Sequence, residues 1–229
     1  RQFHQFDMEV ISNDDDPVYD AQTILVGYRL LEGLKIKDVK IVVNTIGCKH
    51  CRPGFRRELK DYFTEKKEEL CKDCCRRLVE NPLRILDCKE EKEQELKQGA
   101  PLVIDHLCTH CHNHFKTVLE YLDELKLPYS LDHYLVRGLD YYTKTVFEFM
   151  VEGVPFALGG GGRYDYLIEL LGGKSTPAVG CAMGIERIIE TMKLRGIAPS
   201  VRTKQKVFLA HIGDLSKRKS LSLVEHLRE

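Results

Sequence analysis

The chain has 229 residues, of which 43% are hydrophobic and 31% are charged, as is typical of a globular protein with one large or two small domains. Lys plus Arg and Asp plus Glu both number 35, so the net charge gives no general case for a nucleic-acid partner. No apolar run is long enough to span a bilayer, and the N-terminus does not resemble a signal peptide. Nine cysteines in such a chain favour metal sites or free thiols over disulfides, so we expect a cytoplasmic protein.

Period-two alternation predicts a first strand over residues 1–11, in which Gln5, Asp7 and Glu9 share one face. Two acids and an amide make an unusual core face. They suit the floor of a polar pocket, although spacing alone favours a plain exposed sheet face. Because the chain begins inside this strand and ends inside an apparent helix, we expect a piece of a longer polypeptide.

The next two elements have clear boundary signals. Three aspartates precede Pro17 at a plausible first helical position, and an apolar stripe then continues to about Leu34. Gly33 marks the end of this helix. The run VKIVVN over 39–44 predicts a second strand.

From residue 46 to 128 the charge density rises, and eight of the nine cysteines fall in this part of the chain. We interpret it as a helical insertion. Its expected elements are one or two amphipathic helices over 56–80, a short break or strand over 81–89, a solvated helix or loop over 90–98, and an amphipathic helix over 107–126.

Strand character returns after residue 128, where two strands are expected before residue 153. The four glycines 159–162 predict a sharp turn into a helix, or a wall where backbone approaches a ligand. A short strand or glycine turn and a helix from about Gly184 come next. After a linker, a buried strand over 206–214 and a helix predict the opening of a second, α/β domain.

The cysteines form three C-x2-C pairs, the spacing that zinc sites use in intracellular chains. The ligand set stays open, because a tetrahedral site needs only four ligands and the alternative is free thiols in a reduced helical domain. The candidates are Cys48, Cys51, Cys71, Cys74, Cys75, Cys88, Cys108 and Cys111, with His50, His110, His112 and His114.

Four segments, taken together, resemble the histidyl-tRNA synthetases. RQFHQFDMEVI resembles the tail of motif 2 of class II aminoacyl-tRNA synthetases, and VGCAMGIERII resembles their motif 3. VRGLDYYTKTVFEF and LGGGGRYDYLIELLGG match two segments particular to the histidine enzymes, and the insertion resembles that of their bacterial members. The resemblance covers essentially the whole chain.

The resemblance implies ATP-dependent activation of L-histidine to histidyl-adenylate and transfer to tRNA(His) by a homodimer that uses ATP with Mg²⁺. The implied fold is α+β, an antiparallel sheet flanked by helices, with a helical insertion near the tRNA acceptor arm and the start of an α/β anticodon-binding domain. The expected division is therefore 1–45 and 129–200 for the catalytic core, 46–128 for the insertion and 201–229 for the anticodon-binding domain.

The resemblance also implies roles for individual residues of the site. Arg137 would reach the histidine carboxylate and the α-phosphate, and is the expected catalytic residue. Arg187 would bind ATP. The remaining expected contacts surround the histidine: Glu9 and Tyr142 at the imidazole, Gln5 at the α-amino group, and Tyr141, Tyr164 and the glycines 160–162 along the walls of the pocket.

The chain also departs from the family pattern. Motif 1 and the front half of motif 2 are absent, so we expect this chain alone to be inactive. The runner-up is a non-catalytic paralogue such as the regulatory subunit of ATP phosphoribosyltransferase, against which the intact RGLDYYT segment argues. A third hypothesis, a zinc-binding tRNA-interaction module, fits the cysteines but leaves Gln5, Glu9, Arg137 and Tyr142 unused.

Overall fold

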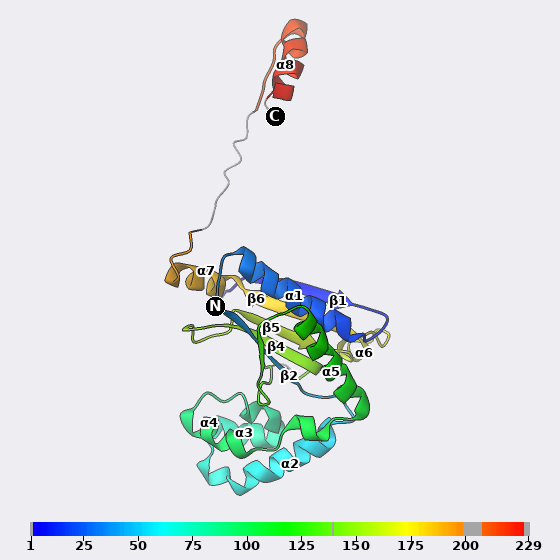
Figure 1. Ribbon diagram of the computed structural model, residues 1–229, viewed down its shortest axis with the longest axis vertical. Helices are drawn as coiled ribbons and strands as arrows, with labels where there is room; N and C mark the ends of the chain where they lie inside the picture. The colour runs from blue at the N-terminus through cyan, green and yellow to red at the C-terminus, as the bar shows by residue number, and fades with distance from the viewer. Residues whose placement is uncertain (1, 139, 199–207, 227–229) are drawn as a thin grey trace. The chain divides into compact units, whose positions relative to one another are not determined.

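The computed structural model describes residues 2–138, 140–198 and 208–226 (Figure 1). The chain consists of two compact units, Arg1–Ile197 and Ala198–Glu229. Within the described residues, no helix combines the length and the apolar character that a membrane crossing requires.

The first unit is built on one six-stranded sheet of order β1-β6-β5-β4-β2-β3. Neighbouring strands run antiparallel, except that β2 and β3 are parallel. This sheet and the helices beside it confirm the expected α+β class with a mostly antiparallel sheet. The strands are β1 (Gln5–Ile11), β2 (Val39–Thr45), β3 (Tyr129–Leu131), β4 (Thr143–Val151), β5 (Gly159–Arg163) and β6 (Ala178–Gly184).

Two helices pack against one face of this sheet, α1 (Pro17–Gly33) and α5 (Thr109–Glu124) (Figure 1). Helix α1 begins as expected, because the Asp16 side chain accepts a hydrogen bond from the Val18 N–H at 2.9 Å. The core joins apolar side chains of both helices to those of β4 and β6, including Ile24, Val118, Phe147 and Met183. Helix α5 thus packs with the sheet, although its residues were placed in the insertion on sequence grounds.

The insertion has a core of its own. Helices α2 (Arg52–Glu65), α3 (Lys72–Glu80) and α4 (Glu91–Leu96) surround it, and side chains such as Phe55, Leu59 and Ile85 fill it. The same cluster includes Tyr142 and Val146, so the insertion packs directly on the sheet beside β4. The segment 81–89, for which a break or strand was expected, contains a short 3-10 helix over Pro82–Ile85.

The four glycines form a strand, so the prediction of a sharp turn was wrong. They occupy β5 at the centre of the sheet, between β4 and β6. A Cβ on Gly160 would lie 2.6 Å from the Phe147 carbonyl oxygen, and one on Gly162 would lie 2.5 Å from that of Thr145. Neighbouring backbones approach too closely for side chains here, which explains why residues of low strand propensity make a central strand.

Two further helices complete the first unit, α6 (Leu167–Leu170) and α7 (Ile185–Leu194). In the second unit, residues 208–213 form no strand, and α8 (Asp214–His226) follows. The expected buried strand over 206–214 is therefore not formed in its described part, and residues 206 and 207 lie outside the described residues. Phe208 and Ile212 are both 93% exposed, since the described part of this unit offers no second strand to pair with.

Candidate functional site

The face of the sheet opposite α1 and α5 carries a floor of small residues with acids at its ends. Asp7 on β1 pairs with Ala182, Ala182 with Gly160, and Gly160 with Glu148 on β4. Directly opposed residues in antiparallel strands point to the same face, so these four residues form one row. The neighbouring row begins with Glu9 and continues through Gly180, Gly162 and Val146. Small residues at the centre of both rows leave room above the sheet.

Arg137 lies over this floor. Its guanidinium forms an ion pair with Glu148, and a Cβ added at Gly160 would lie only 2.9 Å from Arg137 Nη1. The Nε atom of Arg137 is buried and has no hydrogen-bond partner among the described residues. Glu148 was overlooked in the sequence, where the signal available was a single acid within the apolar run VFEFM of the predicted strand.

A cluster of aromatic residues closes one end of the floor beside Glu9. The Tyr164 hydroxyl donates a hydrogen bond to the Glu9 carboxylate. The rings of Tyr141 and Tyr142 have centroids 4.7 Å apart, and that of Tyr164 lies edge-on to both. Burial raises the pKa of Tyr142, and burial together with the bond to Glu9 raises that of Tyr164, so both remain protonated donors. The pKa of Glu9 is itself raised by burial, a shift that the bond from Tyr164 opposes.

A cavity of about 450 Å³ occupies the other end of the floor. Gln5, Arg137, Glu148 and Arg187 all line it, so it joins three of the expected site residues with the acid that was overlooked. Arg187 lies in the first turn of α7, donates to the Ala157 carbonyl at 2.9 Å, and stacks 5.4 Å from the Phe156 ring centroid. The cavity therefore presents two guanidinium groups and two carboxylates, those of Glu148 and Glu186, above a glycine-rich floor.

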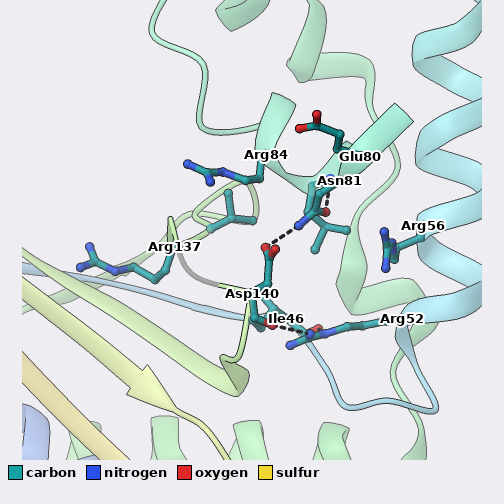
Figure 2. Close-up of a pocket in the computed structure, with 10 residues that line it drawn as sticks. Ile46, Arg52, Arg56, Glu80, Asn81, Arg84, Arg137 and Asp140 are labelled. Carbon is teal, nitrogen blue, oxygen red and sulfur yellow. Dashed lines mark hydrogen bonds between the residues drawn. The ribbon is translucent and has the colours of Figure 1, made fainter. Parts of the chain in front are cut away.

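A second cavity, of about 280 Å³, lies between the insertion and the loop that carries Arg137 (Figure 2). Four arginines line it: Arg52, Arg56, Arg84 and Arg137. At its centre the Asn81 side chain donates to the Asp140 carboxylate at 2.5 Å, which ties this loop to the insertion. Asp140 thus has a structural partner in the insertion. Arg137 borders both cavities.

Replacing Gly180 with alanine is expected to disturb the site without unfolding the protein. A Cβ at this position would overlap the Glu9 carboxylate, so the Glu9 side chain must leave its place beside Tyr164. We expect binding of any ligand at Glu9 to weaken by about 10-fold or more, which isothermal titration would measure. Gly33→Ala is the control, because nothing lies within 4 Å of its added Cβ. Unchanged binding in Gly180→Ala would show that Glu9 does not hold the ligand.

A buried charge network lies at the end of β5 and was not anticipated from the sequence. Arg163 is 1% exposed and contacts Asp20 of α1, with its Nε 2.9 Å from Asp20 Oδ2. The same guanidinium reaches Asp165 at 3.2 Å, and His114 of α5 lies 3.4 Å from Asp20 Oδ1. Lys144, buried and in a left-handed conformation with φ of 50°, reaches Asp165 at 2.9 Å. These contacts join α1 and α5 to the strands that carry the glycine floor.

The cysteines gather into two groups. The first C-x2-C pair meets the third and forms what we call the four-cysteine group, Cys48, Cys51, Cys108 and Cys111. The second pair forms what we call the cysteine–glutamate group, Cys71, Cys74, Cys88 and Glu93. Within each group the potential ligand atoms lie within 4.8 Å of one another. The four candidate histidines belong to neither group; His114, for example, contacts Asp20.

Comparison with known proteins identifies the family. A family model described as histidyl-tRNA synthetase matches residues 1–188. A histidine–tRNA ligase of Halothermothrix orenii is 45% identical and one of Desulforamulus reducens is 43% identical, and both alignments cover 100% of this chain and 55% of the relative. The structure resembles that of an apo histidyl-tRNA synthetase of S. aureus, with a TM-score of 0.72 and 34% identity over 100% of this chain and 56% of that one.

The chain spans about half the length of the curated relatives it matches. The family model nevertheless covers most of the chain, including β1, the loop with Arg137, the glycine strand and the first turn of α7. The chain belongs to the histidyl-tRNA synthetase family.

Proposed function

We propose that the protein containing this chain is a histidine–tRNA ligase, which activates L-histidine with ATP and transfers it to tRNA(His). The observation that carries this proposal is the placement of Arg137 over the glycine floor, between the Glu9–tyrosine cluster and the cavity with Arg187. That arrangement offers one end for an amino-acid side chain, one end for a nucleotide, and a fixed cation between them.

The tyrosine cluster is the proposed histidine pocket. Glu9 would accept a hydrogen bond from one imidazole N–H, while the protonated Tyr142 hydroxyl would donate to the other ring nitrogen. Tyr141 and Tyr164 would line the walls, and Gln5 would hold the α-amino end. Polar pairing of this kind rejects analogues strongly, because an amino acid without the ring nitrogens offers no partner to the Tyr142 hydroxyl or to the second oxygen of Glu9, which Tyr164 does not occupy.

Arg137 is the proposed catalytic residue. A carboxylate oxygen of histidine would attack the α-phosphorus of ATP, forming the acyl–phosphate bond as pyrophosphate leaves. The carboxylate is already ionised, so this step needs no general base, and orientation with charge stabilisation suffices. The Nε of Arg137, which has no partner among the described residues, suits a phosphate oxygen.

The cavity with Arg187 suits a nucleoside triphosphate such as ATP, together with Mg²⁺. Two guanidinium groups match the phosphates, and the Phe156 ring beneath Arg187 adds a flat apolar surface. Of the two carboxylates that line this cavity, Glu186 already binds His4, so Glu148 would hold Mg²⁺, a cation that prefers oxygen ligands and would neutralise phosphate charge. ATP and Mg²⁺ are proposed on this basis, and Zn²⁺ on the basis of the cysteine groups.

We propose the four-arginine cavity as the place where the acceptor end of tRNA(His) enters (Figure 2). In the second step a terminal ribose hydroxyl would attack the histidyl carbonyl carbon, with AMP as the leaving group. Phosphates of the acceptor strand would lie against Arg52, Arg56 and Arg84, and the buried Nε of Arg84 has no partner among the described residues. This position is next to Arg137, where the adenylate would form.

The remaining assignments are proposals as well. We propose a homodimer, a catalytic core over 1–45 and 129–200 and an anticodon-binding domain that begins at 201–229. For the insertion we propose a shorter span than 46–128, because α5 packs with the sheet core. The competing function, a regulatory paralogue, would bind histidine and form no adenylate.

The test is histidine-dependent ATP–pyrophosphate exchange by the complete protein, together with Glu9→Gln. We expect exchange in the wild type, and a fall in kcat/KM for histidine of about 10- to 150-fold in Glu9→Gln, since a hydrogen bond to a charged group is lost. KM for ATP should change little. Glu120→Gln on the exposed side of α5 is the control. Histidine binding without any exchange would favour the regulatory paralogue and overturn the enzyme proposal.

A further inference from the structure

We propose that the chain holds two structural zinc ions, one at the four-cysteine group and one at the cysteine–glutamate group, and that the first fixes the wall of the histidine pocket. The first statement concerns metal content and stands on the cysteine geometry alone. The second rests on the proposed function, because it concerns histidine binding.

The four-cysteine group has the dimensions of a tetrahedral thiolate site. A zinc ion with Zn–S bonds of about 2.3 Å separates its sulfur ligands by about 3.8 Å. The Sγ atoms of Cys48 and Cys51 are 3.6 Å apart, and those of Cys48 and Cys108 are 4.0 Å apart. These distances bracket the tetrahedral value and are far longer than the roughly 2 Å of a disulfide. Cys111, the fourth ligand, is fully buried.

Backbone N–H groups around the four-cysteine group donate hydrogen bonds to two of its sulfur atoms, as they would to thiolates. The N–H of His50 points at Cys48 Sγ at 3.4 Å, and the N–H of Cys108 points at Cys51 Sγ at 3.2 Å. Such outer contacts stabilise thiolate ligands and fix their orientation. Gly47 adopts a left-handed φ of 63°, and a Cβ there would lie 2.7 Å from that of Cys51. A glycine is therefore required for the chain to turn closely around this group.

The cysteine–glutamate group contains a buried carboxylate that supports the second zinc site independently of the first. Glu93 of α4 is 2% exposed, and no cationic side chain pairs with it among the described residues. Its carboxylate accepts a hydrogen bond from the Cys71 N–H at 2.6 Å and lies beside three thiols. A buried carboxylate without a cation is costly, and Zn²⁺ accepts carboxylate and thiolate ligands. The adjacent Cys75 does not join this group, because its Sγ faces the Lys67 and Leu70 carbonyls.

The position of the four-cysteine group connects it to the histidine pocket. Cys48 and Cys51 stand where the chain leaves β2 for the insertion, and Cys108 and Cys111 where it returns into α5. Arg52, the residue after Cys51, donates to the Tyr142 carbonyl and to the Ile46 carbonyl, the latter at 3.3 Å. Zinc at this point would hold Arg52, and Arg52 would hold the backbone of Tyr142. Arg52 is thus a positioning residue for the pocket.

Zinc content decides the first statement. We expect the complete protein, purified without added metal or chelator, to contain two zinc ions per chain by mass spectrometry. X-ray absorption should show an average of about 3.5 sulfur ligands per zinc at about 2.3 Å. Cys111→Ser should retain one zinc whose sulfur count falls toward three, and Glu93→Gln should retain only the zinc of the four-cysteine group, so that its sulfur count rises toward four. Cys75→Ser, the matched control next to Cys74, should retain both.

Cobalt substitution tests the same two sites in the wild type, so it does not depend on whether a variant folds. Co²⁺ added to the metal-free protein should give the visible absorption of tetrahedral thiolate coordination, with two equivalents needed for saturation. A wild type with no zinc and no such spectrum would overturn both sites. Two zinc ions in Cys111→Ser with an unchanged sulfur count would overturn the four-cysteine site alone, and the same result in Glu93→Gln would overturn the cysteine–glutamate site.

Histidine affinity decides the second statement. Arg52→Ala should keep two zinc ions and raise KM for histidine by about 10-fold, with KM for ATP little changed. Arg52→Lys, which keeps a donor, should recover part of this loss, whereas Arg57→Ala, at an exposed position of α2, should leave histidine binding unchanged in the exchange reaction. An Arg52→Ala protein with normal histidine KM would refute the positioning role. Absence of exchange in the wild type would instead refute the proposed function and leave the zinc result standing.

Discussion

Replacing Arg137 with alanine should lower the rate of histidine-dependent ATP–pyrophosphate exchange by about 100- to 1,000-fold, the usual cost of removing one preorganised charge-stabilising group. Its guanidinium is held by Glu148 over Gly160, so it is in place before substrates bind and needs no reorganisation during the reaction. The fall should appear mainly in kcat, since the negative charge on the α-phosphate oxygens is largest in the transition state. Steady-state kinetics of the complete protein would measure it.

Two further variants separate chemistry from folding in this experiment. Arg137→Lys keeps the charge without the planar fork and should recover only part of the rate. Arg29→Ala removes an arginine that is exposed on α1 and pairs with Glu32, and it should behave as wild type. If Arg137→Ala exchanges pyrophosphate within about threefold of wild type, the transition state does not depend on this guanidinium.

Hydrophobic period was sufficient to predict much of the fold. The apolar stripes of α1 and α5 predict helices, because each helix buries one face against the sheet. The apolar run of β2 predicts a strand because it lies inside the sheet and is largely buried. The glycine strand shows the limit of this reasoning. Glycines have low intrinsic strand propensity, and β5 forms only because β4 and β6 lie on both sides of it. The conformation of β5 is therefore set by its neighbours in the sheet, and the sequence of β5 carries no periodic pattern that would predict it.

The candidate site shows the same division between local and long-range information. Period two placed Gln5 and Glu9 on one face of β1, and the motif resemblance selected Arg137. Strand register decides what faces them, however, and it brings Glu148 on β4 into the same cavity as Gln5. Register depends on the order of strands in the sheet, which spacing along the chain does not encode.

The cysteines were also predictable only in part. Spacing found the C-x2-C pairs but did not decide which of them meet. The first pair meets the third because β2 and α5 bring both ends of the insertion to one place. Glu93 was assigned to a solvated segment because its neighbours are nearly all charged or polar, yet the fold of α4 against Cys71 buries it.

The buried network at Arg163 leads to the largest expected effect on stability. Asp20, Arg163 and His114 are almost fully enclosed, and Asp20 is the carboxylate that faces both of the others. Removing one partner of a buried ion pair leaves an uncompensated charge and typically costs about 3–5 kcal/mol. We therefore expect Asp20→Ala to lower the free energy of unfolding by this amount in urea titrations followed by circular dichroism. Asp73→Ala, which breaks an exposed pair with Arg76, should change it little.

Lowering the pH should remove the contribution of the Asp20 carboxylate to the free energy of unfolding of the wild type. Burial tends to raise the pKa of Asp20, but the hydrogen bond from His114 and the charge of Arg163 outweigh it, so the pKa lies below its usual value. A depressed folded-state pKa stabilises the protein above the unfolded value of about 3.9 and loses that effect as pH falls through the folded value. The unfolding free energy of the wild type should therefore fall more steeply below about pH 4 than that of Asp20→Asn.

A double variant distinguishes the ion pair from simple packing. If the cost of Asp20→Ala comes from the charge left on Arg163, then adding Arg163→Met should recover stability, because an apolar pair avoids the desolvation penalty. If the cost comes from a cavity, the second substitution should add a further loss. Equal stability of wild type and Asp20→Ala would mean that Arg163 is compensated by Asp165 alone, which lies 3.2 Å from its Nη1. The network would then orient the end of the glycine strand without stabilising the fold.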